Sequence, residues 1–199
     1  MEPNDVRDKI TNGFVGRYSY DHATVGGIAI HHSVTSISPD VTPDEEFIHL
    51  QAIDNYHASQ GWGGFGYHLA AFPSGTLWYC GDLAAARAHV ANRNYELLGL
   101  VLIGDFTVDP PPPAQLEAAA WGVAFIRSHW GPKPILGHRH WALPAFATAC
   151  PGDTWQAWIS ALEAPPVPPP PPPAPASLKS PILAHLDEIR RLVEGLPIP

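Results

Sequence analysis

The stretch GIAIHHSVT, residues 27–35, joins an apolar run to a pair of histidines. Small and β-branched residues continue from residue 26 up to the pair, which is typical of a buried β-strand. Side chains alternate between the two faces of a strand, so His31 and His32 must point in opposite directions. Only one of the two histidines can therefore reach a site on a given face of the sheet.

Further strands are predicted after this stretch in the sequence. LLGLVLI at 97–103 is a continuous apolar run of strand length, as expected at the centre of a sheet that is covered on both faces. Residues 67–72 and 76–79 flank a Pro-Ser-Gly turn and predict a hairpin. Residues 135–136 form a further short apolar run and predict one more strand.

Two helices are predicted between these strands and a third after the last of them. The first begins with a capping box of Thr42 and Glu45 around Pro43 and should continue to Ser59. The others are expected at residues 114–130, after a run of prolines, and at 153–163. Because strands and helices interleave, the sequence predicts an α/β fold with a mixed central sheet flanked by helices.

The chain divides into three parts by composition. We expect a single catalytic domain over residues 1–164, a proline-rich linker over 165–179 and a short amphipathic helix over 180–199. The linker contains PPVPPPPPPAPA, which favours an extended polyproline II spacer. The apolar stripe of the terminal helix needs a partner, which would be the same domain, a second copy of the chain or another molecule.

Charge and apolar patterning exclude several classes of protein. The chain has 199 residues and a formal net charge of −8 with only 11 Lys and Arg, which argues against nucleic-acid binding. No apolar run is long enough to span a membrane, and the N-terminal residues show no signal peptide, so we expect synthesis in the cytoplasm. A disulfide between the two cysteines, Cys80 and Cys150, is conceivable, but one pair is no disulfide framework, and Cys80 fits a small buried hydrophobe.

Histidine and cysteine side chains form the candidate chemical site. His31 lies in the first stretch, and His138 and Cys150 lie in ILGHRHWALPAFATACPGDTW, residues 135–155. Two imidazoles and a thiolate suit zinc and leave a fourth position for water, which zinc makes acidic enough to act as a nucleophile near neutral pH. The set therefore indicates a zinc hydrolase. His140 is a rival to His138 as the second ligand.

Four motifs in order resemble one known family. IAIHHSVT, GWGGFGYHLAAFPSGTLWYCGDL, RAHVANRNYELLGLVLIGDF and GHRH…TACPGDTW are similar to motifs of the type 2 zinc N-acetylmuramoyl-L-alanine amidases. That family includes phage lysozymes of the T7 type and the peptidoglycan recognition proteins. The resemblance implies a mixed sheet flanked by helices and a zinc ion at the floor of a surface groove. It also implies hydrolysis of the amide between N-acetylmuramic acid and L-alanine.

The resemblance assigns roles to individual residues. It implies that His31, His138 and Cys150 are the zinc ligands and that Tyr67, in GYH, is the catalytic tyrosine. Thr148, two residues before the cysteine, takes the place of a polar catalytic helper that is lysine in some members of the family.

Substrate contacts are expected from His89, with Asn94 and Trp62 as further groove residues. The chain also departs from the family pattern. The interval between the second and third ligands is longer than usual, so residues 141–146 should bulge beside the metal, and His140 stands where an acidic residue is common.

The expected function is therefore that of an amidase that cuts peptidoglycan, as a phage or prophage endolysin that reaches the cell wall through a phage pore. One alternative is a cytoplasmic recycling amidase that acts on soluble muropeptides. A second is a peptidoglycan-binding module that has lost its activity.

Overall fold

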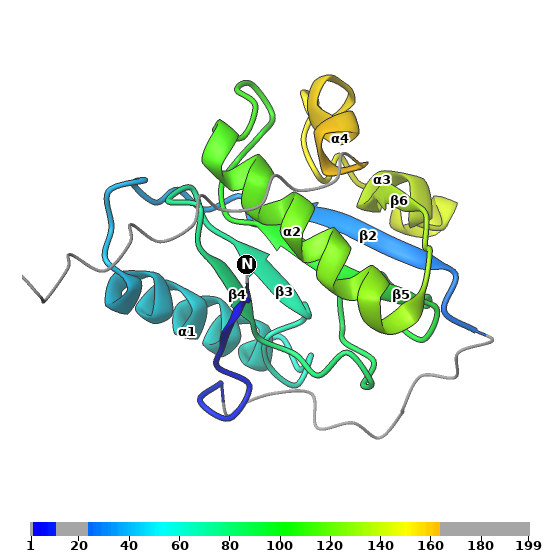
Figure 1. Ribbon diagram of the computed structural model, residues 1–199. Helices are drawn as coiled ribbons and strands as arrows, with labels where there is room; N and C mark the ends of the chain where they lie inside the picture. The colour runs from blue at the N-terminus through cyan, green and yellow to red at the C-terminus, as the bar shows by residue number, and fades with distance from the viewer. Residues whose placement is uncertain (1, 11–23, 164–199) are drawn as a thin grey trace, which may run out of the picture. The chain divides into compact units, whose positions relative to one another are not determined.

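The computed structural model describes residues 2–10 and 24–163 of the chain (Figure 1). The expected proline-rich linker at 165–179 and the expected terminal helix at 180–199 lie outside these residues. The structure therefore does not test self-association through that helix. Among the described residues, none of the helices combines the length and the apolar character that crossing a bilayer requires.

A six-stranded mixed sheet forms the centre of the fold, as predicted, with the strand order β1-β4-β3-β5-β2-β6. The strands are β1 (Asn4–Asp5), β2 (Gly27–His32), β3 (Leu69–Ala71), β4 (Leu77–Tyr79), β5 (Leu97–Leu102) and β6 (Ile135–Gly137). β3 and β4 form the predicted hairpin and pair antiparallel, whereas the other neighbours pair in parallel.

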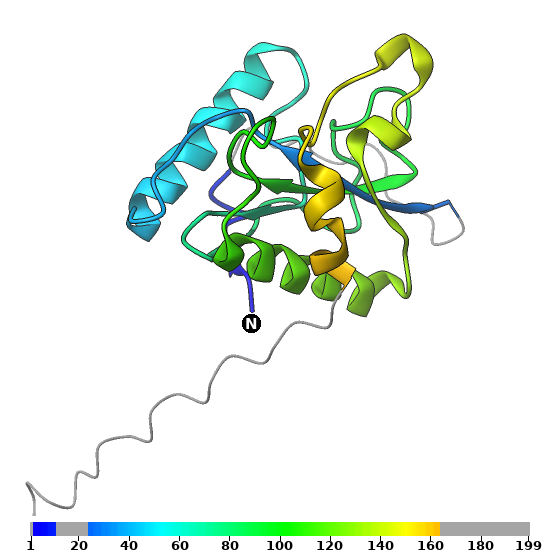
Figure 2. The same ribbon diagram turned by 90° about the horizontal axis from the view of Figure 1, so that it is seen from above.

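Helices cover both faces of the sheet. They are α1 (Pro43–Ser59), α2 (Pro113–Trp130), the short α3 (His138–Trp141) and α4 (Trp155–Glu163), with a 3-10 turn η1 (Pro144–Phe146). Figure 2 shows α1 and α2 on opposite sides of the sheet, with α4 beside α2. The three long helices therefore complete a three-layer α/β arrangement.

The predicted capping box fixes the start of α1. The Glu45 amide donates to Oγ1 of Thr42 at 3.3 Å, and the Thr42 amide donates to Oε2 of Glu45 at 2.8 Å. Pro43 occupies the first turn, where its missing N–H costs nothing. The helix ends at Ser59, as predicted, and delivers the next loop to the edge of the site.

Alternate residues of β5 enter two separate cores. Leu98 and Leu100 pack into the core beneath α2, which includes Val123. Val101 packs on the other side of the sheet with Leu50 of α1. The strand is buried along its whole length, as its continuous apolar sequence predicts.

Candidate metal centre

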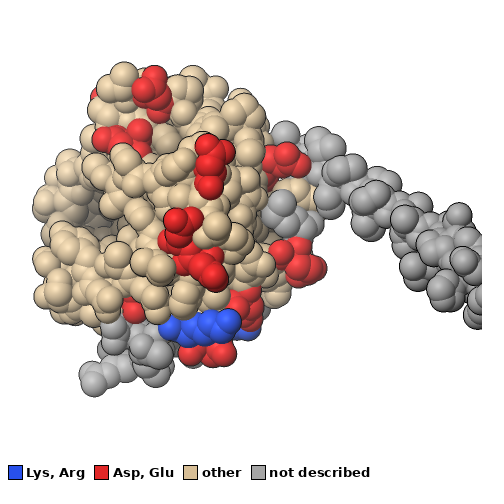
Figure 3. All heavy atoms as spheres, turned by 90° about the vertical axis from the view of Figure 1, so that its left-hand side faces the viewer, with Lys and Arg blue, Asp and Glu red and all other residues tan. Residues whose placement is uncertain are grey.

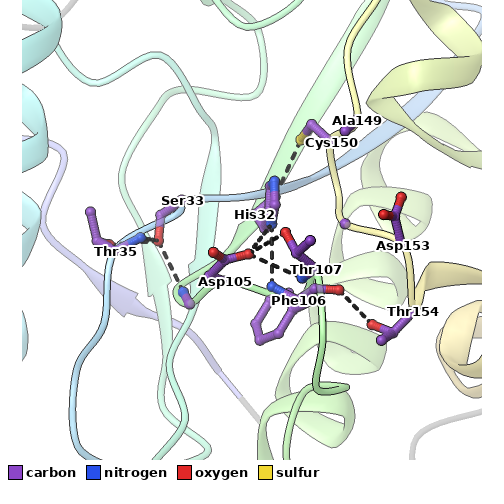
Figure 4. A network of polar contacts seen from close by, with 12 residues as sticks. His32, Ser33, Thr35, Asp105, Phe106, Thr107, Ala149, Cys150, Asp153 and Thr154 are labelled. Atoms are coloured by element: carbon purple, nitrogen blue, oxygen red, sulfur yellow. Dashed lines mark hydrogen bonds and ion pairs between the residues drawn. The ribbon is translucent and has the colours of Figure 1, made fainter.

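The two histidines at the end of β2 lie on opposite faces of the sheet, as the alternation of a strand predicts. His31 is buried on the side of α1, whereas His32 points toward the loop after β5 (Figure 4). Nδ1 of His32 accepts from the Phe106 amide at 3.4 Å, and the His32 amide donates to Sγ of Cys150 at 3.4 Å. One strand thus holds a candidate ligand and also supports the cysteine.

Three potential ligand atoms meet at the C-terminal end of β2. One atom each of His31, His138 and Cys150 lies within 4.8 Å of the others. Nδ1 of His31 and Sγ of Cys150 are 3.7 Å apart. Ordinary Zn–N and Zn–S bond lengths in a tetrahedral site put such a nitrogen and sulfur about 3.6 Å apart, so the spacing fits zinc.

Arg139 anchors the cysteine loop to the helix that carries His138. Its amide donates to the carbonyl oxygen of Cys150 at 2.9 Å. Its guanidinium donates to the carbonyl oxygen of Gly152 at 2.7 Å and to Asp153 at 3.1 Å, and it also contacts the carbonyl oxygen of Ala149. The second and third ligands are therefore held together by the residue that follows the second ligand in the sequence.

Burial keeps both candidate imidazole ligands neutral. It lowers the pKa of His31 well below its usual value and, helped by the neighbouring His32, lowers the pKa of His138 to about 4. Burial also raises the pKa of the Cys150 thiol to about 12, against hydrogen bonding from the His32 amide. Two neutral imidazoles and one thiol that a metal would have to deprotonate are a donor set that zinc favours, so the residues fit this ion.

The structure brings His138 rather than His140 to this cluster. The ring of His140 packs against Trp155 instead, with the centroids 5.2 Å apart. Both cysteines are free thiols, and Cys80 is buried in the core on the α1 side.

A cavity of about 510 Å³ opens above the three ligands. Its walls include Tyr56 and Trp62 from the end of α1 and the loop after it, and Phe146 from η1. Among the described residues, no Asp, Glu, Lys or Arg lines this cavity. Figure 3 shows a face with a hollow at one edge, bordered by uncharged side chains, while acidic groups are spread elsewhere over it.

Both predicted catalytic residues line the same cavity. The ring of Tyr67 lies beside His31, with the centroids 5.0 Å apart. Burial and the nearby Cys150 raise the pKa of the Tyr67 phenol, so it keeps its proton at neutral pH and can donate it in a hydrogen bond. Thr148 also lines the cavity, and its Oγ1 accepts from the Cys150 amide at 3.1 Å.

The three predicted substrate residues lie at different depths. Trp62 is 45% exposed at the cavity wall. His89 is buried beneath His31, with its Nδ1 3.0 Å from Nε2 of His31. Asn94 reaches the cavity, and its Oδ1 accepts from the amides of His89 and Val90. His89 and Asn94 thus make hydrogen bonds to other protein groups close to the candidate ligands.

Sequence reasoning did not single out Arg139 or Phe146. The signal for Arg139 was its place in the GHR triplet, directly after a ligand. The signal for Phe146 was the long interval between the second and third ligands, which folds as α3 and η1 and places this ring at the cavity.

The fold is a mixed sheet flanked by helices, and two histidines and a cysteine gather at the floor of its cleft. This arrangement places the chain in the class of α/β proteins with a candidate zinc site. The chain belongs to the N-acetylmuramoyl-L-alanine amidase family, whose family model matches residues 21–153.

Individual relatives are similar to this chain in sequence, and solved structures are similar to it in fold. Peptidoglycan-recognition protein LB of Drosophila melanogaster is 30% identical over 137 residues, which are 67% of this chain and 57% of that protein. The endolysin of Enterobacteria phage K11 is 28% identical over 67% of this chain and 85% of its own length. The structure of Drosophila PGRP-LB superimposes with a TM-score of 0.67 at 25% identity, covering 80% of this chain and 92% of that chain. The amidase LysC of Clostridium intestinale shares the fold, with a TM-score of 0.61 at 19% identity and coverage of 82% and 99%.

Proposed function

We propose that this protein is a zinc-dependent amidase that hydrolyses the bond between N-acetylmuramic acid and L-alanine in peptidoglycan. The observation that carries the proposal is the cluster of His31, His138 and Cys150, with its ligand atoms within 4.8 Å of one another, at the floor of a cleft in a member of this family. Its substrate and partner is therefore peptidoglycan.

The side chains around the cluster have distinct roles in this proposal. Zinc held by the three ligands would supply a Lewis acid and a water molecule of lowered pKa. Tyr67 keeps its phenolic proton and donates a hydrogen bond to the oxygen of the scissile carbonyl as negative charge develops on it. Thr148 adds a neutral hydroxyl on the cysteine side of the cleft. It brings no positive charge, so the protein offers the oxyanion only two neutral hydroxyl groups, those of Tyr67 and Thr148.

We place the site of action at the bacterial cell wall, as a phage or prophage endolysin. The endolysins of Enterobacteria phage K11 and Klebsiella phage KP32 support this, since this chain aligns with 85% and 83% of their lengths. A recycling amidase with the same chemistry would instead prefer small soluble muropeptides to intact wall.

The experiment that tests the proposal compares two substrates. Purified protein is incubated with intact sacculi and, separately, with a soluble muropeptide, each with and without a chelator, and new L-alanine amino termini are measured. Chelator-sensitive release from sacculi is expected. Release from the muropeptide alone would assign the protein to recycling, and no release from either substrate by zinc-loaded protein would contradict an amidase.

Peptidoglycan binding without cleavage is the second candidate function. It is favoured by the similarity to peptidoglycan-recognition proteins. The presence of Cys150 and Tyr67 in the cleft instead favours the enzyme, because a binding module needs neither a thiolate ligand nor a catalytic phenol. Sedimentation of zinc-loaded protein with sacculi that stay uncut would support the binding module.

A further inference from the structure

A chain of two hydrogen bonds runs from the candidate ligand His31 into the backbone. Nε2 of His31 lies 3.0 Å from Nδ1 of His89. On the far side of the second ring, Nε2 of His89 lies 3.0 Å from the carbonyl oxygen of Leu97. Both histidines are buried, so water does not compete for these contacts.

The direction of both hydrogen bonds follows from the chemistry of the last group. A carbonyl oxygen can only accept, so Nε2 of His89 must carry a proton. In a neutral ring Nδ1 then has a free lone pair, and Nε2 of His31 must donate to it. His31 therefore keeps its own lone pair on Nδ1, the atom that lies 3.7 Å from Sγ of Cys150.

The surroundings of His89 hold it in this pose. Oδ1 of Asn94 accepts from the His89 amide at 2.9 Å and from the Val90 amide at 2.8 Å. These two bonds fix the backbone before and after the Cα atom of His89. Gly99 of β5 lies directly against the ring, where a Cβ atom would come within 3.0 Å of two ring atoms. A side chain at this position would press the ring a few tenths of an ångström away from its place beside His31.

We propose that His89, held by Asn94 and Gly99, is a positioning residue that sets the tautomer of His31 and aims Nδ1 of that ring at the metal. This inference rests on the proposed function, because it takes the cluster to be a metal centre. It assigns His89 and Asn94 to the support of a ligand instead of to contact with the substrate. Groups that orient a metal-bound histidine commonly contribute 10- to 100-fold to metal affinity.

The first test measures zinc affinity by competition with a chromogenic chelator. His89→Ala should bind zinc roughly 10- to 100-fold more weakly than the wild type. His89→Asn should recover most of the loss, since its Oδ1 takes the place of Nδ1 and can accept from Nε2 of His31. Gly99→Ala should also weaken binding by crowding the ring. His49→Ala, which removes a histidine that bonds to Thr35 outside the cluster, is the matched control and should bind zinc as the wild type does.

The second test reads the tautomer directly in zinc-free, ¹⁵N-labelled protein. The imidazole resonances of His31 should show a proton on Nε2 in the wild type and a mixture of tautomers in His89→Ala. A proton on Nδ1 of His31 in the wild type, or wild-type zinc affinity in folded His89→Ala, would overturn the inference. Failure of the wild type to bind zinc would contradict the proposed function, whereas the tautomer measurement would still decide the role of His89.

Discussion

Single side chains at the candidate metal centre are held in states that differ from those they would have in water. The Cys150 thiol is the clearest case, since burial raises its pKa to about 12 while a metal ligand has to be a thiolate. The only aid in the described surroundings comes from the His32 amide, at 3.4 Å from Sγ, and from the nearby charge of Arg139. A bound cation must therefore supply most of the free energy needed to deprotonate the thiol. Without a cation, Cys150 should be a poor nucleophile.

Removal of a ligand should abolish metal binding, and the two histidines of HRH offer a matched pair. We expect the zinc affinity of His138→Ala to fall by more than the roughly 100-fold that is lost with a group that only orients a ligand. His140→Ala should keep its zinc, because this ring packs on Trp155. The zinc content of each dialysed protein is measured by atomic emission. Retention of zinc in the first variant and its loss in the second would show that the ligand is His140.

Removal of the Tyr67 hydroxyl should slow the reaction without affecting the metal. Tyr67→Phe keeps the ring beside His31 but cannot donate to a developing oxyanion. We expect kcat to fall by roughly 10²- to 10³-fold, with zinc affinity unchanged. Steady-state kinetics on a soluble muropeptide gives kcat, and a variant as fast as the wild type would remove Tyr67 from the chemistry.

That His31, His138 and Cys150 would meet was predictable from the sequence because each lies in a recognisable local motif. The partners of His89 were not. Its contacts to His31 and Leu97 depend on how β2 and β5 align, and no spacing along the chain encodes that alignment.

Among the helices, α1 owes its boundary to the capping box of Thr42 and Glu45. Thr42→Ala removes the acceptor of the Glu45 amide and should lower the free energy of unfolding by about 1 kcal/mol. The activity of the folded enzyme should not change, because the capping residues lie at the opposite end of α1 from Tyr56. Urea denaturation followed by tryptophan fluorescence checks the first statement, and an unchanged midpoint would contradict it.

The segment between His138 and Cys150 contributes one aromatic ring to the cleft. Phe146 lines the cavity and is 45% exposed, so a bound substrate can cover it. We expect Phe146→Ala to raise KM for sacculi by roughly 2- to 10-fold with little change in kcat, as the loss of one aromatic contact would. Leu143→Ala is the control, since this residue is 40% exposed in the same segment but is not part of the cavity wall. Equal KM values for the two variants would rule out a specific contact by Phe146.

The regular elements were predictable wherever their sequence pattern was long enough. β5 and α1 were expected from a continuous apolar run and a capping box, and both are present. β1 was not expected, because two residues have no periodicity and its pairing with β4 joins segments more than 70 positions apart. α3 and η1 were also missed, since each is about a single turn, too short to show a periodic pattern.

At the scale of the whole molecule, buried neutral histidines should make the fold sensitive to acid. Burial lowers the pKa of seven of them, which are His31, His32, His49, His57, His68, His89 and His138. Below pH 6.5 the unfolded chain binds protons that the folded chain excludes, so the free energy of unfolding falls as the pH falls. The loss should continue toward the folded pKa values, which are about 4 for His138 and about 3 for His89.

The thermal midpoint of metal-free protein, measured from pH 7.5 to 4.5, checks this expectation. Each excluded proton removes about 1.4 kcal/mol of stability per pH unit, so several together should give a steep decline below pH 6.5. Zinc should shift the decline to lower pH by binding only the folded form. A midpoint that stays level down to pH 5 would show that the buried rings are protonated in the folded protein.

The contacts of Arg139 on either side of Cys150 have a consequence for how this family can diversify. They fix the distance between the second and third ligands independently of the chain that runs between them. A change of length in that interval should therefore leave His138 and Cys150 together, and it would rebuild the cleft wall to which Phe146 belongs. The wall of the cleft can thus differ in shape while the three side chains at its floor keep their positions.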